Sequence, residues 1–87
     1  MKPWFVYILC CADGTLYTGI STDVSRRTEE HNSDHGLGAR YTRARRPVRL
    51  VYQEAVANRA AATRREAAIK KLSRAAKLTL IGGIPQV

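Results

Sequence analysis

The sequence predicts a small α+β domain in which a three-stranded antiparallel sheet is flanked by helices, in the order ββαβαα. Two apolar runs joined by an Asp-Gly turn predict a hairpin, and a third run near the middle of the chain supplies one more strand. Segments with helix-capping residues separate and follow these strands. A length of 87 residues suits a single domain over residues 1–87, so the helices must cover this one sheet.

The hairpin comes first in the chain. Residues 4–11 are apolar, aromatic and β-branched, as in a buried strand, and Ala-Asp-Gly-Thr at residues 12–15 forms the turn. Residues 16–20 make the returning strand, and residues 48–56 are predicted to be the third. The only cysteines, Cys10 and Cys11, are adjacent, which strains a disulfide, so we expect two reduced thiols.

A first helix follows the hairpin. Ser21 or Thr22 can cap it, Asp23 is well placed for the helix dipole, and the helix is predicted to end near Asn32. Residues 33–47 hold two glycines and a cluster of arginines, and we predict a loop there.

Two helices close the domain. Asn58 can cap a long helix that ends near Leu72, and Ser73 can cap a last helix over residues 74–81. The pair Gly82-Gly83 then closes the chain's last helix, because glycine readily adopts the left-handed conformation of a C-cap.

The charge narrows the class of partner. Fifteen Lys and Arg oppose seven acids, which leaves a net charge of +8. A small domain this basic suits nucleic acid, an anionic membrane surface or an acidic protein. No run approaches transmembrane length and no signal peptide is recognisable, so we expect a cytoplasmic protein without a membrane partner.

The cations concentrate in the predicted loop and just beyond it. No acid occurs between residues 35 and 53, where the following cluster stands: Arg40, Tyr41, Arg43, Arg45, Arg46 and Arg49. This pattern indicates an arm that follows phosphates, with Tyr41 able to stack on an unpaired base. A solvated loop is the alternative. Because no base-reading element is evident, recognition by shape or strand character is favoured over recognition of sequence.

The first helix lacks the apolar stripe that a packed helix normally shows. Its only large apolar residue is Val24, and the face through Val24 continues with Arg27 and His31. A cation that faces a sheet needs a partner. Either Arg27 holds a phosphate beside His31, or Arg27 pairs with a neighbouring glutamate, Glu29 or Glu30, on a solvated helix.

Several of these residues occur in a recognisable order. Tyr7 ends a Phe-Val-Tyr triplet, Tyr17-Thr18-Gly19 begins ten residues later, Arg27 comes eight residues after Gly19, and His31 and Glu66 lie downstream. The arrangement resembles the GIY-YIG nuclease family across essentially the whole chain. Residues 38–42, 45–47 and 50–52 are similar to those of its short, stand-alone bacterial members.

The resemblance implies a three-stranded antiparallel sheet with flanking helices and one divalent metal, Mg²⁺ or Mn²⁺. It implies a metal-dependent nuclease of little sequence specificity, in DNA repair or processing, with nucleic acid as partner and DNA favoured over RNA. Residue by residue, it places tyrosines near the attacking water, an arginine on the phosphate, a glutamate on the metal and a histidine supporting a tyrosine: Tyr7 and Tyr17, Arg27, Glu66 and His31.

Two positions depart from the family pattern. Phe5 stands where the first motif has glycine, and Ile20 follows Gly19 where some relatives carry a lysine that contributes to catalysis. A weakly catalytic or non-catalytic nucleic-acid-binding module therefore remains the alternative to a nuclease. A basic protein-interaction or ribosome-associated module is a third hypothesis.

The chemistry suits these residue types, although each also has a purely structural interpretation. Tyrosine has a free pKa near 10, so a nearby cation or metal must favour the phenolate, and we favour Tyr7 over Tyr17 as the base. Glu66 is a hard oxygen ligand that suits Mg²⁺, but it also stands four residues before Lys70, as in an ordinary helix ion pair. Gly19 can end its strand or let a phosphate approach closely.

Overall fold

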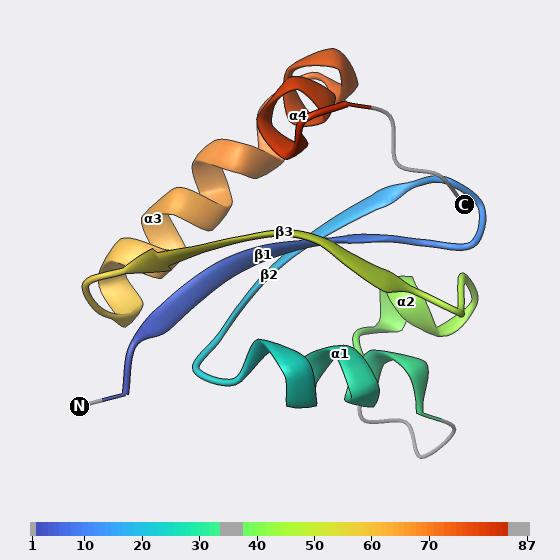
Figure 1. Cartoon of the computed structure of the whole chain (residues 1–87), viewed down its shortest axis with the longest axis horizontal. Coiled ribbons are helices and arrows are strands. Elements are labelled where there is room, and N and C mark those ends of the chain that lie inside the picture. The colour runs from blue at the N-terminus through green and yellow to red at the C-terminus, as the bar shows by residue number, and fades with distance from the viewer. Residues whose placement is uncertain (1, 34–37, 84–87) are drawn as a thin grey trace.

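The computed structural model describes residues 2–33 and 38–83 of the chain (Figure 1). It confirms the predicted class, a three-stranded antiparallel sheet flanked by helices. The elements in chain order are β1 (Trp4–Cys10), β2 (Leu16–Ser21), α1 (Val24–Asn32), α2 (Arg40–Arg43), β3 (Arg49–Val56), α3 (Arg59–Lys70) and α4 (Arg74–Ile81).

The first strand of the chain is the central strand of the sheet. The strand order is β2-β1-β3, and β1 runs antiparallel to both neighbours. Tyr7 lies opposite Gly19 of β2 on one side and Gln53 of β3 on the other. Because β1 has a neighbour on each side and helices on both faces, its residues from Val6 to Leu9 are almost fully buried. Strand β2 is left as one edge of the sheet.

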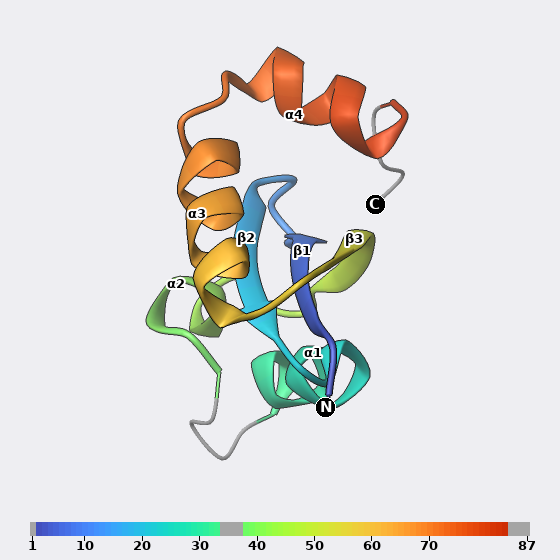
Figure 2. The ribbon, with the colours of Figure 1, turned by 90° about the vertical axis from the view of Figure 1, so that its left-hand side faces the viewer.

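Alternate residues of β1 enter two separate apolar clusters. Tyr7 and Leu9 pack with Val24 of α1, whereas Val6 and Ile8 pack with residues of α3 on the opposite face. Figure 1 shows α1 and α2 on one side of the sheet and α3 and α4 on the other. Figure 2, turned by 90°, shows α3 running beside β2. The edge strand β2 therefore separates the first helix from the third.

Most predicted helix ends are confirmed. Asn58 accepts a hydrogen bond from the Ala61 backbone at 2.9 Å, and Ser73 accepts one from Ala76 at 3.1 Å. Gly82 ends α4 in the left-handed conformation, with φ of 92°. None of the described helices is long and apolar enough to cross a membrane.

Two local predictions are wrong. The N-cap of α1 is Asp23, whose carboxylate accepts from the Arg26 backbone at 3.1 Å, while Ser21 instead accepts from the Asp23 backbone at 2.9 Å. The predicted loop 33–47 contains the short helix α2, although residues 34–37 lie outside the described part of the chain. This helix forms because Thr42 is buried against α1, a tertiary contact that local sequence does not reveal.

Candidate active site

Gly19 allows Tyr7 to reach the β2 edge of the sheet. The two residues are direct partners across the β1–β2 ladder. A Cβ atom added to Gly19 would lie 2.5 Å from Cζ of Tyr7 and would also collide with its hydroxyl. The tyrosine ring therefore lies across the space that a side chain at Gly19 would fill. Gly19 does not end its strand, because β2 continues to Ser21.

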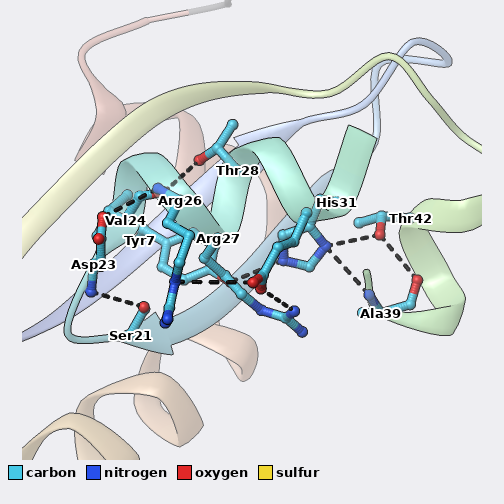
Figure 3. A network of polar contacts seen from close by, with 11 residues as sticks. Tyr7, Ser21, Asp23, Val24, Arg26, Arg27, Thr28, His31, Ala39 and Thr42 are labelled. Atoms are coloured by element: carbon cyan, nitrogen blue, oxygen red, sulfur yellow. Dashed lines mark hydrogen bonds and ion pairs between the residues drawn. The ribbon is translucent and has the colours of Figure 1, made fainter. Parts of the chain in front are cut away.

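His31 meets the hydroxyl of Tyr7 at this edge. The Tyr7 oxygen lies 2.9 Å from Nε2 of His31, and Figure 3 shows the imidazole between Tyr7 and Thr42. The His31 side chain comes from the face of α1 that also carries Val24, as the sequence pattern predicted, and both residues are buried. Burial, followed by the positive charge of Arg27, lowers the pKa of His31 to about 4. The imidazole is therefore neutral at pH 7.

Arg27 lies on the same side of α1 and acts on two groups. The charge of its guanidinium works against the rise in the pKa of Tyr7, and its Nη1 lies 2.9 Å from Oε1 of Glu30. The sequence left two interpretations of Arg27 open, and the ion pair with a neighbouring glutamate, which is one of them, is present in the structure. The side chain is still 29% exposed, so the guanidinium can be reached from solvent.

Glu66 approaches from the other side of the sheet. It stands on α3 between Ala62 and Ile69, which are both fully buried, and its side chain is 22% exposed. Its Oε2 lies 3.4 Å from Nζ of Lys70, so the ordinary helix ion pair is also present. The negative charge of Glu66 is close enough to contribute to raising the pKa of Tyr7. This influence of Glu66 on the phenol is the weakest of those that act on it, and it comes from the opposite face of the sheet.

Tyr7 keeps its proton at neutral pH. Burial, and then the neighbouring Tyr17 and Glu66, raise its pKa to about 12, while the nearby guanidinium of Arg27 works in the opposite direction. Tyr17 packs in the same cluster as Tyr7, and its ring centroid lies 5.1 Å from that of His31 in an edge-on arrangement. Both strand tyrosines thus face the same side of the sheet, which the sequence left open.

The comparison with known proteins agrees with this arrangement. The GIY-YIG catalytic domain matches residues 3–79. The chain belongs to the GIY-YIG family. It is 62% identical over 78 residues to the UPF0213 protein DP2720 of Desulfotalea psychrophila, covering 90% of this chain and 70% of that protein. It is 51% identical over 86 residues to a UPF0213 protein of Syntrophus aciditrophicus, covering 99% and 98%.

Two solved structures share the fold. The solution NMR structure of the UPF0213 protein BH0048 from Bacillus halodurans has a TM-score of 0.57 and 47% identity, over 91% of this chain and 82% of that one. The solution NMR structure of EF2693 from E. faecalis has a TM-score of 0.62 and 41% identity, over 93% and 84%. The chain is therefore similar to short bacterial GIY-YIG proteins, and its family is one of nucleases that act on nucleic acid.

GIY-YIG nucleases generally depend on a divalent metal, and the donor atoms here fit a hard ion held loosely. Glu66 is partly exposed and offers two carboxylate oxygens, one of them 3.4 Å from Nζ of Lys70. Within residues 2–33 and 38–83, no cluster of three or more His, Cys, Asp or Glu side chains could hold a metal. One carboxylate suits an ion such as Mg²⁺, which keeps several waters and takes further oxygens from phosphate.

The basic arm is joined to this site through aromatic rings. We use this name for residues 40–46. The ring of Tyr41 stacks with that of Tyr17, with 5.9 Å between centroids and 27° between planes. The guanidinium carbon of Arg45 lies 4.0 Å from the Tyr41 centroid, and Nε of Arg45 lies 3.2 Å from Asp13. A nucleobase can stack on Tyr41 only where Tyr17 and Arg45 leave its ring accessible.

The arginines of the arm differ in their surroundings. Arg45 also donates to the Tyr41 carbonyl at 2.9 Å, and Arg46 donates to the Ser33 carbonyl at 2.6 Å, so both help to hold the arm in place. Arg40 and Arg43 lie at the ends of α2 and are exposed. The arm therefore combines structural cations with cations that face solvent.

Sequence patterns did not reveal two residues of this site, Gly38 and Thr42. Thr42 Oγ1 lies 2.9 Å from Nδ1 of His31, and a Cβ atom on Gly38 would lie 2.7 Å from Cα of His31. Both belong to the segment 38–42, whose resemblance to short bacterial relatives was the one available signal. Neither residue type suggested chemistry there, because the buried contact with His31 exists only after α2 docks on α1.

Proposed function

We propose that this protein is a metal-dependent endonuclease that hydrolyses phosphodiester bonds in DNA with little sequence preference. The observation that carries the proposal is the convergence of three groups on one buried phenol. His31 lies 2.9 Å from the Tyr7 hydroxyl, and the charges of Arg27 and Glu66 both act on the pKa of Tyr7. Packing alone does not call for a base, a cation and an acid around one tyrosine.

Arg27 is proposed to bind a non-bridging oxygen of the scissile phosphate. Its planar guanidinium can give two parallel hydrogen bonds to a phosphate, and the partly exposed side chain can be reached from solvent. The cation offsets the negative charge that repels a nucleophile and grows in the transition state. Glu30, now paired with Arg27 at 2.9 Å, would keep the guanidinium oriented until the phosphate arrives.

Tyr7 is proposed as the general base, with His31 as the acceptor of its proton. As a water attacks phosphorus, the water gives a proton to the Tyr7 oxygen, and Tyr7 passes its own proton to Nε2 of His31 at 2.9 Å. The exchange leaves Tyr7 neutral and His31 as imidazolium. It avoids a free phenolate, which the Tyr7 pKa of about 12 makes costly at pH 7.

Glu66 is proposed to hold the divalent metal, Mg²⁺ or Mn²⁺, in place of its present partner Lys70 at 3.4 Å. A bound divalent ion supplies charge neutralisation of the phosphate and stabilises the leaving oxygen. Because Glu66 is a single ligand, affinity for the metal should be low until the substrate adds its own oxygens.

The basic arm is proposed to hold the substrate backbone. Its exposed arginines can follow phosphates, and the stacking of Tyr41 on Tyr17, which packs in the same cluster as Tyr7, supports a position of the arm beside the proposed general base. DNA is favoured over RNA, with a role in repair or processing. Cytoplasmic location belongs to the same proposal, because both the substrate and the free thiols of Cys10 and Cys11 suit that reducing compartment.

The second candidate is a nucleic-acid-binding module that does not cleave. The ion pairs Arg27–Glu30 and Glu66–Lys70 favour it, because both charged groups of the site have internal partners. The two candidates differ in one measurable property, which is divalent-dependent cleavage.

The test is a cleavage panel with Mg²⁺ and Mn²⁺ over single-stranded, duplex, flapped and branched DNA, and over RNA. We expect Glu66→Gln to abolish cleavage while DNA binding in EDTA stays near wild type, because the change removes the ligand charge and keeps the shape. Glu29→Gln, an exposed acid of α1, is the matched control and should cleave normally. Normal cleavage by Glu66→Gln would leave this acid as a partner of Lys70 only.

A further inference from the structure

Thr42 contacts the side of His31 that faces away from the proposed base. Its side chain is 0% exposed, and its Oγ1 lies 2.9 Å from Nδ1 of His31. The same oxygen lies 2.9 Å from the carbonyl oxygen of Ala39. His31 is 1% exposed, so both nitrogens of its ring have protein partners in a buried setting (Figure 3).

Counting protons along this chain of hydrogen bonds assigns each donor. The Ala39 carbonyl can only accept, so the single hydroxyl proton of Thr42 points to it. Toward His31, Thr42 can then only accept, so this bond requires a proton on Nδ1. The backbone N–H of Ala39, 3.3 Å from Nδ1, then has no acceptor there, but Ala39 is only half-buried. A neutral imidazole has one N–H, so Nε2 has a lone pair, and this lone pair faces the Tyr7 hydroxyl at 2.9 Å.

A reversed arrangement of protons is less consistent with the geometry. It would place the proton on Nε2 and use the Ala39 backbone N–H as a donor to Nδ1, at the longer distance of 3.3 Å. His31 would then donate to the Tyr7 oxygen. The proton of Tyr7, a residue only 1% exposed, would lose its acceptor. An unsatisfied buried hydroxyl costs about 1–3 kcal/mol.

We infer that Thr42 is a positioning residue that holds the proton of His31 on Nδ1 and so keeps Nε2 ready to take the proton of Tyr7. The inference deepens the proposed function and rests on it for its catalytic meaning. It also explains why α2 packs on α1: the segment 38–42 brings a hydroxyl and its acceptor carbonyl to the imidazole. Gly38 permits this approach, since a Cβ there would lie 2.7 Å from Cα of His31.

The experiment reads the tautomer directly. Long-range ¹⁵N–¹H NMR of the imidazole rings distinguishes the protonated from the unprotonated nitrogen, and a His35→Gln background leaves His31 as the only histidine. We expect the Nδ1–H form in wild type and in Thr42→Ser, which retains the hydroxyl. Thr42→Val has nearly the same shape without the hydroxyl, and it should populate the Nε2–H form.

The same variants are tested for single-turnover cleavage. Thr42→Val should cleave about 10-fold more slowly, because this factor corresponds to the free energy of one neutral hydrogen bond. Thr42→Ser should restore most of the rate. The matched control is Thr28→Val. Thr28 also donates to a backbone carbonyl, that of Val24 at 2.8 Å, and its hydroxyl proton is thereby used away from the imidazole, so tautomer and rate should stay as in wild type.

An Nε2–H tautomer in wild type would overturn the inference, and this measurement needs no variant that might alter folding. An unchanged tautomer in a folded Thr42→Val would also overturn it. Failure of the proposed function would give a different result. Wild type would then cleave no substrate, while the tautomer of His31 would still depend on whether residue 42 has a hydroxyl.

Discussion

Replacing Gly19 with alanine tests whether the position of the Tyr7 ring matters for the reaction. A Cβ at Gly19 would lie 2.5 Å from Cζ of Tyr7. Carbon atoms in contact are separated by about 3.5–4.0 Å, so the ring would have to move by about 1 Å or more. A displacement of about 1 Å at a reacting group can lower a rate by about 100-fold. We therefore expect Gly19→Ala to reduce single-turnover cleavage by about that factor.

The same substitution should have opposite effects on stability in two backgrounds. In wild type it overpacks the β1–β2 pair and should lower the free energy of unfolding by about 1–3 kcal/mol. In a Tyr7→Val background the ring is gone. Alanine should then be neutral or stabilise by up to about 1 kcal/mol, because glycine is the poorer strand residue. Urea unfolding of the four proteins, followed by circular dichroism, measures this coupling.

Two results would refute the reasoning. If Gly19→Ala stabilises both backgrounds equally, Tyr7 does not occupy the space above Gly19. If Gly19→Ala lowers stability as expected but cleaves at the wild-type rate, the place of the hydroxyl is not critical and Tyr7 is not the base.

Three further predictions concern charge and protonation. Arg27→Ala should slow single-turnover cleavage by about 100-fold or more with a smaller loss of binding, whereas Arg26→Ala should leave the chemical step nearly intact; equal effects would refute the role of Arg27. The folded-state pKa of His31 lies below its ordinary value, so the unfolded chain binds a proton first as pH falls. The free energy of unfolding should therefore drop by up to about 3 kcal/mol between pH 6.5 and about 4, and a folded His31→Gln should lack this loss in urea titrations. Replacing Arg40 and Arg43 by alanine should flatten the dependence of log affinity on log salt by roughly 0.7–0.9 for each phosphate that these arginines neutralise, and an unchanged slope would place the binding surface elsewhere.

Local sequence signals predicted the parts of the fold that depend on near neighbours. Asn58 and Ser73 cap their helices because short polar side chains satisfy backbone N–H groups only a few residues away. The cap of α1 was misassigned because Ser21, Thr22 and Asp23 are all suitable, and the choice among them depends on where β2 ends. The short helix α2 was missed for a related reason, since its stability depends on docking against α1.

The order of the motif residues indicated which side chains belong to the site, but not how they meet. Helix periodicity placed His31 on the same face as Val24, and both are buried. Whether Tyr7 and Tyr17 share a side depended on the register of β1 with β2. The contribution of Thr42 was not visible, because a threonine within an arginine-rich stretch has no distinctive pattern.

By itself, the sequence determined the element order, most helix ends, the buried strands and the basic character of residues 40–49. These follow from backbone propensities and side-chain periodicity, which act over a few residues. The tertiary structure decided from which side each group approaches, since Tyr7 packs with α1 whereas Glu66 stands on α3 between two residues that pack on the opposite face. It also decided that Gly19 makes room for the phenol and that Thr42 contacts His31. Such contacts join residues that are distant in the chain, and they form only when the sheet brings its two layers of helices to one edge.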